Sequence, residues 1–83
     1  MISDRNLRRF WFSTPAALGY GVTAYSLSEA QILAREAAAG LGRPFEPVSV
    51  IEDVDVRQLD QNHVVPNMGP PNLHGVWFPR LNI

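Results

Sequence analysis

The chain has no cysteine and no lysine among its 83 residues, and each absence removes a class of chemistry. Without cysteine there is no disulfide bridge, no thiolate nucleophile and no cysteine-ligated zinc site. Without lysine there is no Schiff base to a carbonyl substrate and no lysine of a phosphate-binding loop. The sequence also lacks the Gly-x-Ser-x-Gly pattern of an activated serine. We therefore expect a protein that is not an enzyme and needs no cofactor.

The chain also has little net charge and no long apolar run. Its formal net charge is −1 at pH 7, which argues against a protein that binds mainly by neutralising phosphates. No stretch approaches the ~20 apolar residues of a membrane span, and the first residues lack the apolar run of a signal peptide. All seven basic residues are arginine, a usage typical of bacterial genomes rich in guanine and cytosine. The sequence predicts a cytoplasmic, bacterial protein without membrane contact.

The length allows one small domain, residues 1–83. A chain of this size buries only about 60% of the surface that its unfolded form exposes. Hydrophobic residues make up 46% of the chain and charged residues 18%, which is typical of a globular protein. Because the core of one copy must be small, association into a homo-oligomer, such as a homodimer, is an expected way to bury more surface.

Two segments in the first third have the alternation of β-strands. Residues 7–13 place Phe10 and Phe12 on one face and Trp11 on the other. After a short loop that contains proline and glycine, residues 20–25 resume the alternation with β-prone side chains. We expect an antiparallel hairpin with one apolar face.

The clearest local signal is the start of a helix. Ser26 stands three residues before Glu29, the spacing at which the two side chains satisfy free backbone N–H groups at a helix start. Alanine and leucine then recur with helical spacing, and a glycine at position 40 or 42 supplies the stop. The pattern predicts a helix over residues 27–40 with an alanine-rich buried face that can lie close to the aromatic strands.

The second half predicts a strand, an irregular segment and a short last strand. Valines of one parity predict a third strand over residues 48–56, with a bulge or continuation after Ile51. Residues 60–74 follow no helical or strand period, and residues 75–78 have the composition of a terminal strand. The order ββαβ(β) predicts a small α+β domain, with one helix packed on a sheet of three or four strands in a β-grasp-like arrangement.

The proline-rich last third carries the first functional hypothesis, a protein-binding surface. Long irregular segments are usually functional or disordered, and the large apolar side chains here argue against disorder. Methionine, aromatic residues and arginine are enriched at interface cores, and proline lowers the entropy cost of holding a segment extended. We expect a protein-interaction module, of adaptor, antitoxin or immunity-protein type, that binds a protein partner or itself through Met68, Leu73, Trp77, Phe78 and Arg80. The alternative is that these side chains cap the open end of the core.

A second hypothesis is an accessory role in nucleic-acid binding by the first strand. Cationic groups beside exposed aromatic rings can hold phosphates and stack bases. If Phe10 and Phe12 pack under the helix, Arg9 and Trp11 should face outward. The residues that would form this surface are Arg5, Arg8, Arg9 and Trp11.

A third hypothesis is a pocket for a small ligand or a metal ion. Histidine and carboxylate side chains suit zinc, iron or manganese, and the candidates are Asp60, His63 and His74. The spacing between the two histidines matches no metal-binding signature, so the sequence predicts no specific metal site. The acidic residues after Ile51 are more typical of a solvated strand edge that resists aggregation.

Overall fold

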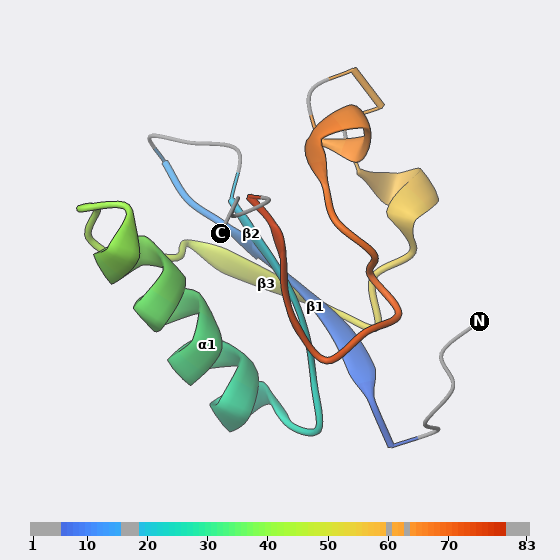
Figure 1. Ribbon diagram of the computed structural model, residues 1–83, viewed down its shortest axis with the longest axis horizontal. Coiled ribbons are helices and arrows are strands. Elements are labelled where there is room, and N and C mark those ends of the chain that lie inside the picture. Colours follow the sequence, from blue (N-terminus) through green and yellow to red (C-terminus); the bar gives the residue numbers. More distant parts are fainter. Residues whose placement is uncertain (1–5, 16–18, 60, 63, 80–83) are drawn as a thin grey trace.

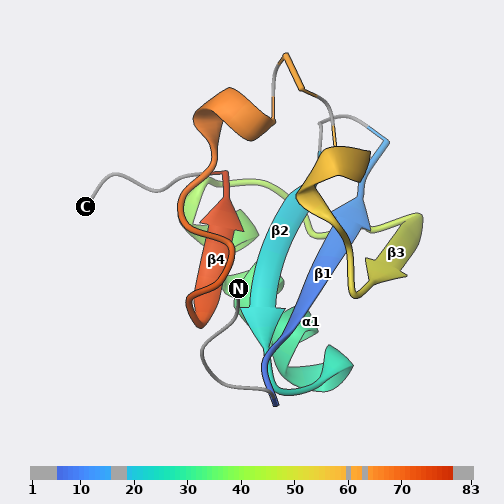
Figure 2. The same ribbon diagram turned by 90° about the vertical axis from the view of Figure 1, so that its right-hand side faces the viewer.

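The structure is a computed structural model that describes residues 6–15, 19–59, 61–62 and 64–79. One four-stranded sheet is formed by β1 (Arg8–Ser13), β2 (Tyr20–Ala24), β3 (Ser49–Glu52) and β4 (Gly75–Phe78), and helix α1 (Leu27–Gly40) packs on one face (Figure 1). The strand order is β3-β1-β2-β4, and every neighbouring pair is antiparallel (Figure 2). The predicted α+β class, with one helix on a small sheet, is confirmed.

Helix α1 begins at the predicted cap. The Ser26 hydroxyl accepts a hydrogen bond from the backbone N–H of Glu29 at 3.1 Å. The Glu29 carboxylate accepts one from the backbone N–H of Tyr25 at 2.9 Å, so it reaches one residue further back than the capping-box pattern predicts. Both side chains still satisfy backbone donors at the start of the helix.

The helix ends in a left-handed turn at Gly42, whose φ is 69°. The Gly42 N–H bonds to the Ala39 carbonyl at 3.0 Å, and the Arg43 N–H bonds to the Ala38 carbonyl at 2.9 Å. These two bonds form a Schellman motif, in which glycine is favoured because it lacks the Cβ that opposes positive φ.

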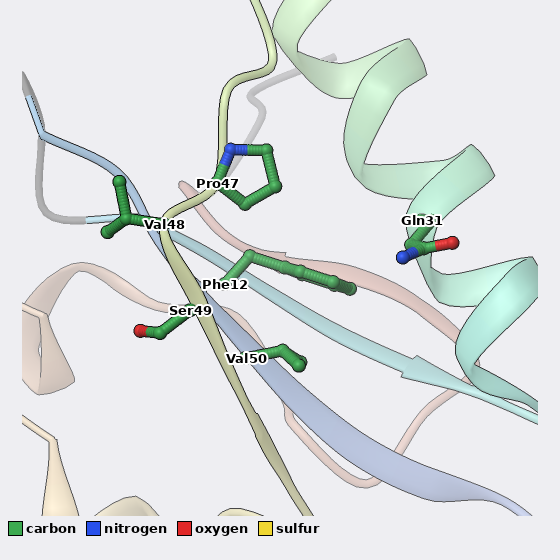
Figure 3. Close-up of a pocket in the computed structure, with 6 residues that line it drawn as sticks. All are labelled: Phe12, Gln31, Pro47, Val48, Ser49 and Val50. Carbon is green, nitrogen blue, oxygen red and sulfur yellow. The ribbon is translucent and has the colours of Figure 1, made fainter.

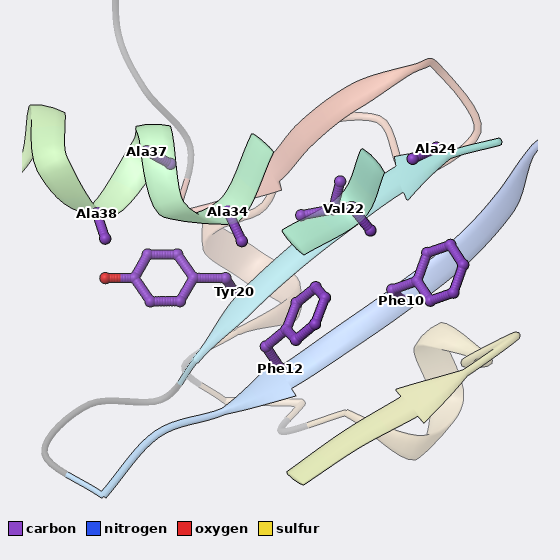
Figure 4. Packing of buried hydrophobic residues seen from close by; sticks show 9 residues of the cluster. Phe10, Phe12, Tyr20, Val22, Ala24, Ala34, Ala37 and Ala38 are labelled. Carbon is purple, nitrogen blue, oxygen red and sulfur yellow. The ribbon is translucent and has the colours of Figure 1, made fainter. Parts of the chain in front are cut away.

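The sheet face under α1 holds the first hydrophobic cluster. Figure 4 shows the rings of Phe10 and Phe12 on β1 and of Tyr20 on β2 beneath the alanine-rich side of the helix. Phe45, from the loop after the helix, contacts Phe12 and Tyr20 edge-on, with ring centroids 5.5 and 5.8 Å apart. Because the four buried helix residues are all alanine, the helix backbone lies close to the sheet.

The opposite face of the sheet is covered by the irregular chain that follows β3. The second cluster consists of Trp11, Val54, Leu59, Val64, Trp77 and Phe78. The Trp11 ring lies 6.0 Å from that of Trp77 and 5.5 Å from that of Phe78. The expectation that Trp11 faces outward is therefore wrong, because a segment without periodicity supplies a second apolar layer.

Strand β3 is shorter than the predicted range of residues 48–56. It stops at Glu52 because Asp53 has a φ of 56°, in the left-handed region that turns the chain. Arg8 holds this turn, with its guanidinium donating to the Asp53 carboxylate at 2.9 and 2.8 Å. Val54 then enters the second cluster, so the valines of one parity do not belong to one continuous strand.

Gly21 on β2 allows the Trp77 ring to lie directly against the strand. A Cβ at this position would lie 2.4 Å from the indole ring, which is closer than two carbon atoms can approach. The pairing of β2 with β4 also shifts register between Gly21 and Val22. The close approach of the Trp77 ring to β2 thus depends on a residue without a side chain.

Candidate functional site

The outer edge of β4 is covered by the chain that precedes it. The Gly69 N–H donates to the Trp77 carbonyl at 2.7 Å. The buried Thr23 hydroxyl donates to the Pro71 carbonyl and accepts a hydrogen bond from the Trp77 indole N–H at 3.1 Å. These bonds fasten residues 69–71 to β4 and β2, so the main chain beside β4 is already engaged within the molecule.

The outer edge of β3 has no such cover in the part of the chain that the structure describes. Strand β3 pairs with β1 on one side, and Figure 2 shows it at the margin of the sheet. All four of its residues are exposed. The apolar side chains there are 69% (Val48), 37% (Val50) and 39% (Ile51) exposed. Edge strands are usually guarded by charge, proline or a covering loop, whereas the middle of β3 is apolar.

A hollow lies beside this open edge, between β3 and α1. It has a volume of about 210 Å³ and is lined by Phe12, Gln31, Pro47, Val48, Ser49 and Val50. The hollow lies beside β3 because α1 packs mainly over β2 and β4. Figure 3 shows Phe12 and Val50 pointing into this space, toward the helix. Ligand pockets usually measure about 300–1,000 Å³, so this hollow suits one apolar side chain better than a whole cofactor.

Arg8 neutralises part of the negative charge at the end of β3. Its guanidinium contacts the carboxylates of Asp53 and Glu52, the latter at 3.2 Å, and lies 5.3 Å from the centre of the Phe10 ring. The hydrogen bonds from Arg8 lower the pKa of Asp53, and the same bonds raise the pKa of Arg8. Arg8 is thus engaged in ion pairs with residues of the same chain.

The residues of the first hypothesis are divided between core and surface. Trp77 and Phe78 are buried, and Met68 packs against the same cluster. Leu73 is exposed, and Arg80 lies outside the described residues. In this structure Trp77 and Phe78 cap the core and offer no surface to a partner.

The residues of the second hypothesis do not form an exposed cationic and aromatic surface. Arg5 lies outside the described residues, and Arg8 is held in the ion pairs with Asp53 and Glu52. Arg9 is partly buried, on the face of the sheet that also carries the buried Trp11. Trp11 cannot stack on a base while the second cluster covers it.

Of the residues of the third hypothesis, the structure describes His74, whereas Asp60 and His63 lie outside the described residues. His74 Nε2 is 3.0 Å from Glu29 Oε1, and its ring lies 5.4 Å from that of Tyr25. The backbone N–H of Tyr25 and the contact with His74 lower the pKa of Glu29. Across the described part of the chain, no three histidine or carboxylate side chains are grouped as metal ligands would be. The contact between His74 and Glu29 fastens the turn before β4 to the start of α1.

Sequence reasoning missed Val48, Val50 and Ile51 as site residues. Their apolar pattern is readable, and it gave the third strand. The pattern does not show that this strand lies at the margin of the sheet, or that the helix leaves it uncovered. Strand order is a long-range property, and no local motif in this sequence encodes it.

Comparison with protein-family models, with curated proteins and with solved structures found no match for this chain. Within the described residues, no helix has the length and hydropathy that a membrane crossing requires.

Proposed function

We propose that this chain is a non-enzymatic protein-interaction module that binds by accepting a strand of its partner along the open edge of β3. The observation that carries the proposal is the exposure of the whole of β3, together with the apolar side chains of Val48, Val50 and Ile51. Edge strands can bind an extended segment through main-chain hydrogen bonds, while pockets beside them select side chains.

The hollow beside Val50 supplies the selective part of such a site. An added strand runs alongside β3, and its alternate side chains face the same side as Phe12 and Val50. One apolar side chain of that strand can fill the space between β3 and Gln31 of the helix. Main-chain pairing would then give affinity, and the hollow would favour an apolar residue at one position.

The two other hypotheses have less support. Nucleic-acid binding needs accessible arginine and aromatic groups, but Arg8 is ion-paired and Trp11 is buried. A ligand or metal site would have to use Asp60 and His63, whereas His74 is joined to Glu29. The expected bacterial and cytoplasmic setting stays a prediction from composition.

The proposal is tested by capturing partners from a lysate of the source organism on immobilised protein that carries a photo-activated cross-linking group. The sample is treated with nuclease and cross-linked before a high-salt wash, so that weakly bound partners are retained. We expect a stoichiometric protein band with the native chain and its loss with Val50→Lys, because a charge would enter the apolar edge. Ile32→Lys is the matched control, since Ile32 is an exposed apolar residue on α1, and it should retain the band. Retention by the Val50→Lys variant, or loss of all bound material to nuclease, would refute the proposal.

A further inference from the structure

We infer that the strand accepted by β3 is β3 of a second copy of this chain, paired antiparallel with Val50 directly opposite its own counterpart. The inference rests on the proposed function, because it uses the same open edge and names its occupant. It joins two four-stranded sheets into one continuous sheet across a two-fold axis.

The sequence of the edge is self-complementary in this register. The open edge consists of Val48 and the four residues of β3, Ser49–Glu52, so its central residue is Val50. Antiparallel pairing about this centre sets Ser49 opposite Ile51 and Val48 opposite Glu52, and no two like charges face each other. Directly opposed residues lie on the same face of a sheet, so both helices lie on one side and the two hollows become neighbours at Val50.

The charges of the edge select the antiparallel direction. Each copy carries an acidic end at Glu52 and Asp53, of which Arg8 neutralises a part. In the antiparallel register the two Glu52 residues are offset by four positions along the strands, or about 13–14 Å. That separation exceeds the Debye length of ~8 Å at physiological salt, so their repulsion is screened. A parallel pairing would place the two acidic ends side by side.

Pairing of two copies would cover apolar surface that a single copy leaves exposed at β3. Neither covering layer reaches the β3 end of the sheet. Val50, opposite Phe12, is exposed on the helix side, and Ile51, opposite Trp11, is exposed on the other side. A second β3 covers the edge with main chain and sets the two Val50 side chains against each other. A pair of such short strands is small compared with the ~1,200–2,000 Å² of a stable interface, so we expect a weak dimer with a dissociation constant of roughly 10 µM to 1 mM.

The register can be tested with single cysteines, because the natural chain contains none. Directly opposed residues of an antiparallel pair have Cα atoms about 4.5–5.5 Å apart, within the range of a disulfide. The Val50→Cys variant should therefore form a disulfide-linked dimer under mild oxidation. Two controls place the cysteine at exposed apolar positions that the register keeps away from their counterparts. Val48→Cys lies opposite Glu52 and about 13–14 Å from the Val48→Cys position of the second copy, and Ile32→Cys lies on the helix. We expect cross-linking of the Val50→Cys variant to be at least about tenfold faster than that of either control.

The second measurement is the sedimentation of the purified natural chain at concentrations that span the expected dissociation constant, roughly 10 µM to 1 mM. We expect a monomer–dimer equilibrium that Val50→Lys weakens by about tenfold or more, because two lysines would then face each other. Equal cross-linking of the three cysteine variants, or a monomer up to 1 mM, would overturn the inference. If the purified chain is monomeric but capture from lysate still depends on Val50, only self-pairing fails; if capture also fails, the proposed function falls with it.

Discussion

The two edge strands of this sheet differ in their surroundings more than in their apolar content. Strand β4 carries Trp77 and Phe78, which are buried, whereas β3 carries Val50 and Ile51, which are exposed. Residues 69–71 bond to β4 and its neighbour, while no described segment does the same for β3. The comparison shows that an edge is covered or open according to the path of the irregular chain, rather than according to the residues of the strand itself.

The irregular chain after β3 can cover only part of the sheet. It forms the second layer over Trp11 and continues along the β4 edge (Figure 1). The helix is likewise displaced toward β2 and β4. Both covering elements therefore leave the β3 side open, and the open edge follows from the distribution of cover in a small chain.

The largest effect is expected from removing the side chain that secures the covered edge. Trp77→Ala should lower the free energy of unfolding by about 3–5 kcal/mol, because a buried indole that contacts Trp11 and Thr23 is lost. Urea denaturation followed by circular dichroism measures this change. Leu73→Ala is the control at an exposed apolar position of the same segment, and a similar loss there would show that Trp77 has no special place in the core.

A smaller effect is expected at the hydroxyl that joins the covering segment to the sheet. Thr23→Val should lower stability by about 1–3 kcal/mol, because the buried indole N–H of Trp77 and the Pro71 carbonyl lose their partner. Thr23→Ser keeps the hydroxyl and should recover most of this loss. If valine and serine are tolerated equally in thermal denaturation, these hydrogen bonds do not secure the edge.

Acid should loosen the turn at the end of β3 and the one that follows it. Hydrogen bonds from Arg8 lower the pKa of Asp53, and hydrogen bonds from Arg57 lower the pKa of Asp55 to about 2. A carboxylate with a lowered pKa stabilises the fold above its ordinary value of 3.8, and this contribution disappears as pH falls from about 4 toward about 2. Melting temperatures measured between pH 7 and pH 2 should decline in that window. Arg8→Met should reduce the decline, and an unchanged pH profile in this variant would exclude the Arg8 contact as a cause.

The smallest effect on stability is expected at the open edge. Val50→Lys should change the free energy of unfolding of the monomer by less than about 0.5 kcal/mol, because its side chain is exposed and lies at the margin of the core. Denaturation at low protein concentration measures this value. A loss of several kcal/mol would mean that Val50 belongs to the core of a single chain and that β3 is no free surface.

The elements near the helix were predictable from local signals. Alternation in the first strands, the pair Ser26 and Glu29 and the glycine stop gave the hairpin and the helix, and the composition of residues 75–78 gave β4. The parity of Phe10 and Phe12 placed both on one face of the strand, and the structure buries that face under the helix. These features depend on residues that lie close together in the sequence.

The second layer and the candidate site could not be predicted because both depend on distant contacts. Trp11 meets Trp77 across more than sixty intervening residues, and the covering segment has no periodicity to show which face it meets. The turn at Asp53 is set by Arg8, a residue of another strand. The aromatic side chains that indicated a binding surface in the sequence are used in the core, and the exposed edge consists of small aliphatic residues.

The most direct test of the difference between the two edges is amide hydrogen exchange measured by NMR at several protein concentrations. The account predicts that the amides of residues 75–78 stay protected at every concentration. In residues 49–52, the outward-facing amides should exchange quickly in dilute solution and slow down as the concentration rises. Protection of these β3 amides that is the same at all concentrations, whether high or absent, would contradict the claim that this edge is open in one chain and pairs between two.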